Sequence, residues 1–300
     1  MNKLLDLPVI KQVIAFLKAI KPPGFNGFSL FDLFQMYIIG IVEGTLTSRA
    51  GSISFSFFMA LFPFLLFVLN LIPFISNIFH IENFDQHFLE YIEMILPKES
   101  QSFFVTVFED ILNKPRGGLL SSVFLLSIFL TANGVSAIFA GFEVSYHVAL
   151  ARNFIKQYLY ALGVSILLAF LLLMAVILFI YFQIYIPKDM IFLFGYGQFV
   201  IFGFLTYTSV SVLYYFGTIE GRKMRFFSPG ALMTTLLFFL MTYLYGIYID
   251  NFSNYNQLYG SIGALLIFLL YIWMNSNTLL LGFELNATLN RFKREPKALS

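Results

Sequence analysis

The chain has 300 residues, of which 59% are hydrophobic and only 11% are charged, and its mean hydropathy is +0.82. A soluble domain has about 45–50% apolar and about 25% charged residues, so this composition cannot cover a water-exposed body. The net charge of +2 gives no strong attraction for nucleic acid, and the absence of cysteine excludes disulfides and thiol nucleophiles. The three histidines, His80, His87 and His147, show no metal-binding spacing, so we expect no metal. We also expect no nucleic-acid partner, because of the low net charge, and no cofactor, because the sequence has no nucleotide-binding fingerprint.

Residues 1–51 are expected to form amphipathic helices on one membrane surface. An apolar stripe at helical spacing is interrupted by Lys11 and Lys18, which excludes a signal peptide; the stripe comprises Leu7, Ile10, Ile14 and Leu17. Pro22, Pro23 and Gly24 should end this first helix, and a second helical stretch is expected from about Leu30 to Ser48. Packing of both helices against the rest of the chain is the alternative.

Six uncharged stretches follow, each long enough to cross a bilayer, because about 20 apolar residues span the hydrocarbon. They are apolar on all sides, which is unlike the alternating strands of a membrane barrel. We therefore predict an all-α, polytopic membrane domain over residues 52–288, followed by a basic tail over 289–300. The six transmembrane helices are expected at about 52–75, 119–142, 159–182, 191–216, 226–249 and 258–281.

The long loop over residues 76–118 has its own helical pattern, with Pro97 between two amphipathic segments. Their apolar positions are Phe84, Phe88, Tyr91 and Ile95, then Phe104, Val107, Phe108 and Ile111. Acidic residues outnumber basic ones in this loop. A helical cap that binds a partner and a simple solvated face are both consistent with the pattern.

The positions of the basic residues predict the orientation, because cytoplasmic loops of membrane proteins carry an excess of Lys and Arg. Only Lys98, Lys114, Arg116 and Lys188 lie on the side of the long loop. The other side, with both termini, carries Lys3, Lys11, Lys18, Lys21, Arg49, Arg152, Lys156, Arg222, Lys223, Arg225, Arg291, Lys293, Arg294 and Lys297. Both termini are thus predicted to be cytoplasmic, and the loop over 76–118 extracytoplasmic.

Polar side chains within the apolar stretches suggest a path through the bundle, because unsatisfied polar groups are costly in lipid. The candidates are Asn70, Asn133, Asn275 and Asn277. Hydrogen bonding between helices is the alternative explanation. Pro63 lies near the middle of the first stretch, where its missing N–H frees the Met59 carbonyl and should kink the helix.

Three charged residues should lie at the same depth near the cytoplasmic surface. Arg49 precedes the first apolar stretch, Glu143 ends the second, and Glu284 follows the sixth. An arginine flanked by two carboxylates would form a mutually stabilising latch. The alternative is three independently hydrated interfacial residues.

The carboxyl-terminal stretch carries a family resemblance. Tyr259 to Ala264, and then Leu281 to Ala287 with the sequence LGFELNA, resemble the closing motifs of the YihY/virulence-factor BrkB-like family of bacterial membrane proteins. The segments Arg49–Ser56, Leu61–Pro63 and Ser228–Ala231 are similar to other landmarks of that family, in the same order. Phe283 stands where the resemblance implies a small residue.

The resemblance implies a multi-pass protein of the bacterial cytoplasmic (inner) membrane with a role in envelope integrity and a suspected role in lipid or solute export. Some members carry a ribonuclease label, but this sequence offers neither a metal-binding carboxylate cluster nor a basic groove, and we expect no enzyme.

Two functions therefore stay open. The first is a transporter or flippase for a lipid or amphipathic solute, since no charge lies in the middle of the apolar stretches to relay ions. The second is a non-transporting scaffold that recruits envelope partners. Membrane lipids are the expected surroundings, and a homo-oligomer is left open.

Overall fold

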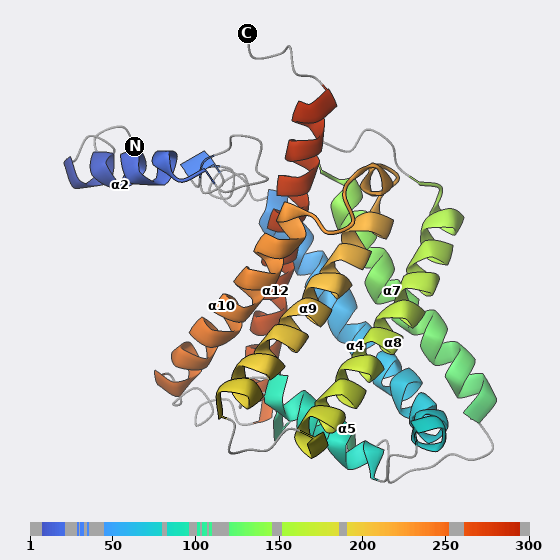
Figure 1. Cartoon of the computed structure of the whole chain (residues 1–300). Coiled ribbons are helices and arrows are strands. Elements are labelled where there is room, and N and C mark those ends of the chain that lie inside the picture. The colour runs from blue at the N-terminus through green and yellow to red at the C-terminus, as the bar shows by residue number, and fades with distance from the viewer. Residues whose placement is uncertain are drawn as a thin grey trace.

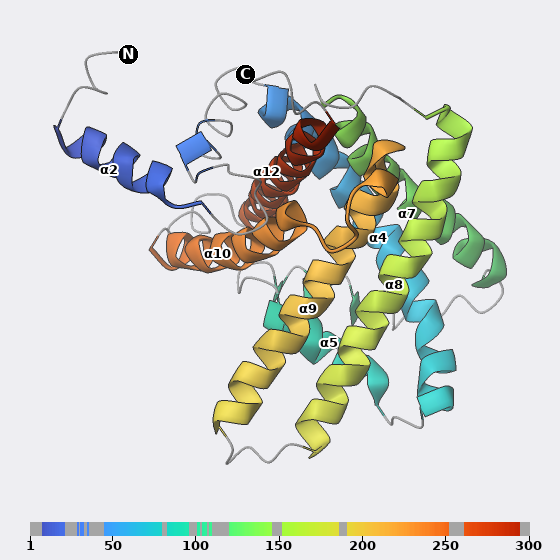
Figure 2. The ribbon, with the colours of Figure 1, turned by 45° about the horizontal axis from the view of Figure 1, so that its top comes forward.

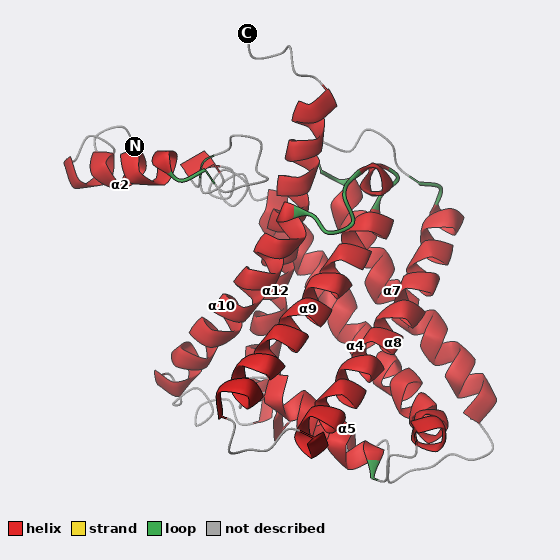
Figure 3. Ribbon diagram, viewed as in Figure 1, coloured by secondary structure: helices red, strands yellow, loops and turns green. Residues whose placement is uncertain are grey.

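The computed structural model describes residues 8–21, 29, 31–32, 35, 45–79, 83–95, 101–102, 104–106, 108–109, 120–145, 152–185, 191–251 and 261–294. In these residues all regular structure is helical, and no strand occurs (Figures 1 and 3). Six helices are long and apolar enough to cross a membrane. The predicted all-α fold class with six candidate spans is therefore confirmed.

The six long helices extend beyond several of the predicted boundaries. They are α4 (Thr45–Phe79), α7 (Leu120–Glu143), α8 (Phe154–Tyr185), α9 (Ile191–Gly217), α10 (Pro229–Asn251) and α12 (Ser261–Arg294). The largest differences are at the start of α4 and the end of α12. Both helices continue into polar sequence, because a helix satisfies its own backbone hydrogen bonds whether lipid or protein surrounds it.

The six helices form a closed ring. In chain order each packs against the next, from α4 to α7, α8, α9, α10 and α12, and α12 packs back against α4. Figures 1 and 2 show that the helices are splayed, so that α10 lies nearly horizontal in Figure 2 while α8 and α9 run steeply. The ring places α12 beside the first long helix, so residues far apart in the sequence meet there.

The two ends of the ring differ in charge. The end where α4 begins and α12 ends carries Arg49, Arg152 and the basic turn η1 (Glu220–Lys223), and we call it the basic end. The opposite end carries α5 (Phe84–Ile95), and we call it the α5 end. A short amphipathic helix, α2 (Pro8–Ala19), lies beside the ring at the basic end (Figures 1 and 2).

The first segment of the long loop forms the amphipathic helix that the sequence predicts. In α5 the apolar stripe of Phe84, Phe88 and Tyr91 is buried. Tyr91 packs against Phe179 of α8 and Phe202 of α9, with ring centroids 5.7 and 5.3 Å apart. Burial raises the pKa of the Tyr91 phenol. The helix is thus inserted at the α5 end between the ring helices.

The second loop segment is described only in part. Phe104 and Phe108 are buried, as the amphipathic pattern predicts, and Phe108 stacks on Phe88 with centroids 5.8 Å apart. Val107 and Ile111 lie outside the described residues.

The buried side chains form two large separate clusters. The cluster at the α5 end contains residues of α4, α5, α8 and α9, including Val68, Phe88, Leu173 and Phe202. The cluster at the basic end draws on α4, α7, α8, α9, α10 and α12 and includes Phe142 and Phe283. The ring is thus packed at both ends by different side chains.

Glycines set the closest helix contacts. A Cβ on Gly134 of α7 would lie 2.6 Å from the Cβ of Ala60 in α4. A Cβ on Gly282 of α12 would lie 1.8 Å from Oγ1 of Thr234 in α10, and one on Gly230 would lie 2.2 Å from the Gly282 carbonyl oxygen. Because none of these glycines carries a Cβ, the helix backbones approach closely, as is common in membrane bundles.

Pro63 lies inside α4, which continues as a helix from Thr45 to Phe79. Figure 1 shows the last turns of this helix nearly end-on, whereas its first turns run obliquely, so α4 changes direction toward the α5 end. A second proline, Pro73, lies in that later part of the helix. Both prolines remove a backbone donor and favour bending.

The N-terminal predictions are met in part. The helix α2 covers most of the first predicted segment, although Leu7 lies outside the described residues. A reciprocal capping box marks the predicted start of the second segment: the Ser29 backbone N–H donates to Asp32, and the Asp32 N–H donates to the Ser29 hydroxyl. The backbone donor lowers the pKa of Asp32. Residues 36–44 of this segment lie outside the described residues.

Candidate functional site: a polar latch at the basic end

Arg49 and Glu284 form an ion pair at the basic end. Both terminal nitrogens of Arg49, in the second turn of α4, lie 2.8 Å from Oε1 of Glu284 on α12. The two side chains are only 10% and 13% exposed. An ion pair so shielded from water holds its geometry only if its remaining donors and acceptors are also satisfied.

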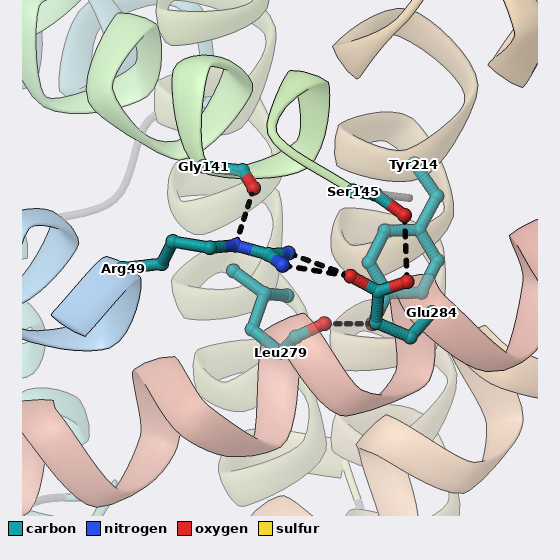
Figure 4. A network of polar contacts seen from close by, with 6 residues as sticks. All are labelled: Arg49, Gly141, Ser145, Tyr214, Leu279 and Glu284. Carbon is teal, nitrogen blue, oxygen red and sulfur yellow. Dashed lines mark hydrogen bonds and ion pairs between the residues drawn. The ribbon is translucent and has the colours of Figure 1, made fainter. Parts of the chain in front are cut away.

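The remaining groups do find partners on other helices (Figure 4). Nε of Arg49 donates to the carbonyl oxygen of Gly141 in α7, at 2.9 Å. The Ser145 hydroxyl, just after α7, donates to Oε2 of Glu284 at 2.6 Å. We call these four residues, Arg49, Gly141, Ser145 and Glu284, the latch. It joins α4, α7 and α12 at one point.

A buried aromatic cluster lies next to the latch. Phe142 of α7 stacks on Phe283 of α12 with ring centroids 4.3 Å apart and planes inclined by 8°, and Tyr214 of α9 meets both rings edge-on. The Tyr214 hydroxyl donates to the Leu279 carbonyl at 2.7 Å and contacts Oγ1 of Thr234 at 2.6 Å. Phe283, where the family resemblance implied a small residue, is therefore a fully buried packing residue.

The start of α10 is anchored to α12 by a side-chain amide. Oδ1 of Asn286 accepts from the Gly230 N–H at 2.8 Å, and its Nδ2 donates to the Ser228 hydroxyl at 2.7 Å. Ser228 itself accepts from the Ala231 N–H, as an N-cap does. The amide of α12 thus satisfies donors that a helix start leaves open.

These contacts bring together three of the motifs that carry the family resemblance, namely Arg49–Ser56, Ser228–Ala231 and Leu281–Ala287, whereas Tyr259 and Gly260 of the remaining closing motif lie outside the described residues. The LGFELNA segment of α12 provides Gly282, Glu284 and Asn286, and these contact α10, α4 and the start of α10 respectively. The entry segment provides Arg49, and Ser54, whose hydroxyl lies 3.2 Å from that of Ser276. Motifs that are distant in the sequence therefore form one contiguous site.

The structure brings two of the three predicted charged residues together and places the third elsewhere. Oε1 of Glu143 accepts from the backbone N–H of Arg152 at 3.1 Å, and its described contacts do not include Arg49. The Glu143 side chain serves the connection between α7 and α8. Ser145, two residues later, takes the position that we had expected the second carboxylate to fill.

The four predicted path residues are not gathered in one place by the described contacts. Asn133 is exposed on α7. The amides of Asn275 and Asn277 donate to the carbonyls of Tyr271 and Trp273 in their own helix, at 2.9 and 2.8 Å. The side chain of Asn70 lies outside the described ones. The polar path through these residues stays a prediction.

Sequence reasoning missed Ser145, Tyr214 and Asn286. Ser145 and Tyr214 lie in segments with no distinguishing pattern. Asn286 belongs to the LGFELNA segment and is polar within an apolar helix, so its residue type was a usable signal. Within the described ranges, no three His, Asp or Glu side chains gather closely enough to hold a metal ion.

The six-helix ring with an ion pair shielded between its spans defines an all-helical, multi-pass membrane protein. The chain belongs to the Virulence factor BrkB family, whose family model matches residues 40–300. No solved structure matches the chain.

Two relatives illustrate the range of the family. The putative ribonuclease-like protein YfkH of Bacillus subtilis (strain 168) is 26% identical over 276 residues, a match that covers 89% of this chain and 97% of that protein. The UPF0761 membrane protein XAC0937 of Xanthomonas axonopodis pv. citri (strain 306) is 34% identical over 77 residues, or 26% of this chain and 18% of that protein. The latter similarity is thus local.

Proposed function

We propose that this protein moves a lipid or amphipathic solute across the bacterial cytoplasmic membrane, with its basic end at the cytoplasmic surface. The observation that carries this proposal is that the two largest buried clusters lie at opposite ends of a closed helix ring. A carrier that opens alternately to two sides needs a seal at each end and a substrate region near the middle of the membrane.

Half-buried polar side chains also occur where α10 faces α12. Thr242 of α10 contacts the Tyr271 hydroxyl of α12 at 2.9 Å, beside a small third cluster that contains Tyr245 and Ile267, and Asn275 lies one turn further along α12. None of the six predicted apolar stretches contains a charged residue. An uncharged middle favours lipids or amphipathic solutes over ions, because ion-coupled carriers use buried carboxylates there.

The latch fits the role of a cytoplasmic gate. Shielding two charges from water is expensive, so a buried ion pair is a poor way to obtain stability alone. A buried ion pair is, however, suited to a two-state contact that is either formed or broken, and here the contacts of Arg49 hold three ring helices together. Opening at this end would separate α4 from α12 and would hydrate both charges, which lowers the cost of breaking the pair.

The proposal is tested with the purified protein in liposomes that contain fluorescent lipids of several headgroups. Dithionite bleaches the outer leaflet, so lipid movement appears as additional bleaching. We expect bleaching beyond the outer-leaflet fraction. Lipid movement no faster than in empty vesicles for every headgroup would contradict the flippase, and would favour the scaffold alternative.

The chain offers a reversible lock for the same assay. It has no cysteine, and the hydroxyls of Ser54 and Ser276 lie 3.2 Å apart across α4 and α12. The double variant Ser54→Cys/Ser276→Cys places two thiols within disulfide reach. We expect oxidation to stop lipid movement and reduction to restore it, whereas each single variant is insensitive to oxidant. Undiminished movement in the cross-linked protein would show that α4 and α12 need not separate.

We further propose that the protein is not an enzyme, although a relative is named as ribonuclease-like. RNA incubated with the purified protein should stay intact. Cleavage that co-migrates with the protein through two independent separations would contradict this.

A further inference from the structure

Two arginines share one aromatic ring at the basic end. The guanidinium carbon of Arg152 lies 4.3 Å from the ring centroid of Tyr160 in α8, and that of Arg222 in η1 lies 4.7 Å from the same centroid. Both distances allow cation–π attraction. The two like charges nevertheless repel each other. The pKa of Arg152 is lowered mainly by burial and also by the positive charge of Arg222.

The two arginines have different roles. Arg152 is half-buried, and its guanidinium donates to the carbonyl oxygens of Phe216 and Thr218 at the end of α9, the second at 2.7 Å. These bonds fix Arg152 in place. Arg222 is exposed, and in the described part of the chain it forms no ion pair. It therefore retains donors for an external anion.

More basic side chains surround this ring. Lys156 precedes Tyr160 by one helical turn, so it lies on the same side of α8, and Lys223 and Arg225 follow Arg222. All three are exposed. The nearby carboxylates are Glu143, which accepts from the Arg152 backbone, and Glu220, which is buried. The cluster is therefore predominantly positive.

An open apolar stripe continues from this cluster along α8. Gly163, Leu167, Phe170 and Met174 follow Tyr160 at helical spacing, and all four are exposed. A Cβ on Gly163 would meet no atom within 4 Å, so the surface below Tyr160 is open. From Gly163 to Met174 the helix rises about 16 Å, which matches half of the ~30 Å hydrocarbon thickness.

We propose that this face of α8 binds an anionic phospholipid of the adjacent leaflet, with its phosphate at Arg222 and Lys156 and an acyl chain along Leu167, Phe170 and Met174. Charge complementarity carries the headgroup assignment, because a phosphate placed at the shared ring offsets the repulsion between Arg152 and Arg222. The apolar stripe selects a lipid over a soluble phosphate. This inference concerns binding and does not depend on whether the protein transports lipids.

The test uses tryptophan quenching by lipids with brominated acyl chains, in the full chain reconstituted in bilayers. The native Trp273 is replaced by Phe, and Leu167→Trp reports on the stripe. Leu130→Trp on α7 is the matched control, because Leu130 is 37% exposed and Leu167 is 39% exposed. We expect brominated phosphatidylglycerol to quench the α8 reporter with at least about fivefold preference over brominated phosphatidylcholine, and the α7 reporter without preference.

Charge removal then identifies the headgroup contacts. Arg222→Gln/Lys156→Gln should reduce the preference at Leu167→Trp to that at Leu130→Trp, whereas Lys11→Gln/Lys18→Gln, which removes two exposed basic charges from α2, should leave it intact. Gel filtration and thermal unfolding identify a misfolded variant. If Leu167→Trp itself obstructs the stripe, Phe170→Trp provides an independent reporter.

The proposal is overturned by equal quenching by both lipids, by a preference that survives the Arg222/Lys156 variant, or by equal loss in the Lys11/Lys18 variant. A competition experiment with inorganic phosphate distinguishes binding of a lipid headgroup from binding of a soluble anion. If inorganic phosphate abolishes the preference while chloride of the same ionic strength does not, the site prefers the soluble anion and the lipid assignment is wrong.

Discussion

At the scale of single residues, Gly282 leaves less room for a side chain than any other glycine in the described ranges. Any Cβ there would meet Thr234 Oγ1, the Tyr214 hydroxyl oxygen and the Gly230 carbonyl oxygen, at 1.8, 2.5 and 2.7 Å. We expect Gly282→Ala to force α10 away from α12 and to abolish most of the folded yield, measured by size-exclusion chromatography of a fluorescent fusion. Gly246→Ala in α10 is the matched control, since its Cβ would meet nothing within 4 Å. Equal yields of the two variants would contradict the close contact.

The latch makes a second residue-scale prediction. Arg49→Gln leaves Glu284 as a shielded carboxylate without its cation, and Glu284→Gln leaves Arg49 without its anion. Each single variant should lose about 3–5 kcal/mol of unfolding free energy, because an unpaired buried charge is costly. The double variant should lose clearly less than the sum of the two.

This coupling is measured by a double-mutant cycle. The unfolding free energy of each variant is obtained by denaturing the protein in detergent and monitoring tryptophan fluorescence. Additive losses in the cycle would mean that the two side chains are hydrated independently, which is the alternative that the sequence left open.

The sequence predicted that Arg49, Glu143 and Glu284 lie near the same end of the bundle, since the end positions of apolar stretches are readable from composition. It could not assign partners. The choice between Glu143 and Ser145 depends on how the chain leaves α7, where one residue rotates a side chain by about 100° around a helix. The Gly282–Gly230 contact was equally unreadable, because glycines are common in membrane helices and their partners are set by helix rotation.

At the scale of elements, α5 shows how an amphipathic pattern became a buried insertion. Its stripe of Phe84, Phe88 and Tyr91 predicted a helix with one apolar face, and such a face is just as consistent with a cap lying on the membrane surface. The structure packs that face against α8 and α9, because Phe179 and Phe202 provide aromatic surfaces at the same end. The sequence pattern identifies the apolar face of α5, but only the packing in the structure identifies the helices that this face contacts.

Phe88 tests this insertion. Phe88→Ala removes a fully buried ring that stacks on Phe108, and should cost about 3–5 kcal/mol of unfolding free energy. Gln86→Ala, on the exposed side of α5, should cost less than about 0.5 kcal/mol. Thermal unfolding of both variants decides the matter: equal melting temperatures would place the helix on the surface.

At the scale of the whole molecule, the number of spans follows from composition, and the ring order follows from packing alone. Consecutive antiparallel helices joined by short connections usually pack side by side, so most of the neighbour contacts in the ring could be predicted from the sequence. The contact between α12 and α4 was not, because nothing in either stretch marks the other as its neighbour.

The orientation of the molecule is tested by single cysteines in the cysteine-free chain. Gln12→Cys on α2 and Arg222→Cys in η1 are exposed at the basic end, and Ser102→Cys is exposed in the long loop. With the basic end in the cytoplasm, a membrane-impermeant maleimide should label only Ser102→Cys in intact cells, and all three after permeabilisation. Labelling of Gln12→Cys in intact cells would show that the orientation is the reverse of the predicted one, and that the proposed lipid site on α8 faces the other leaflet.

The closure of the ring by α12 has a consequence for biosynthesis. Until the ribosome has released this sixth span, α4 sits in the bilayer with Arg49 lacking its carboxylate, and α10 lacks the amide that caps its start. We therefore expect the first five spans to form an intermediate that membrane proteases and chaperones can recognise by its unsatisfied polar groups. A nascent chain interrupted just before Glu284 should be degraded, while one interrupted shortly after Asn290 should persist.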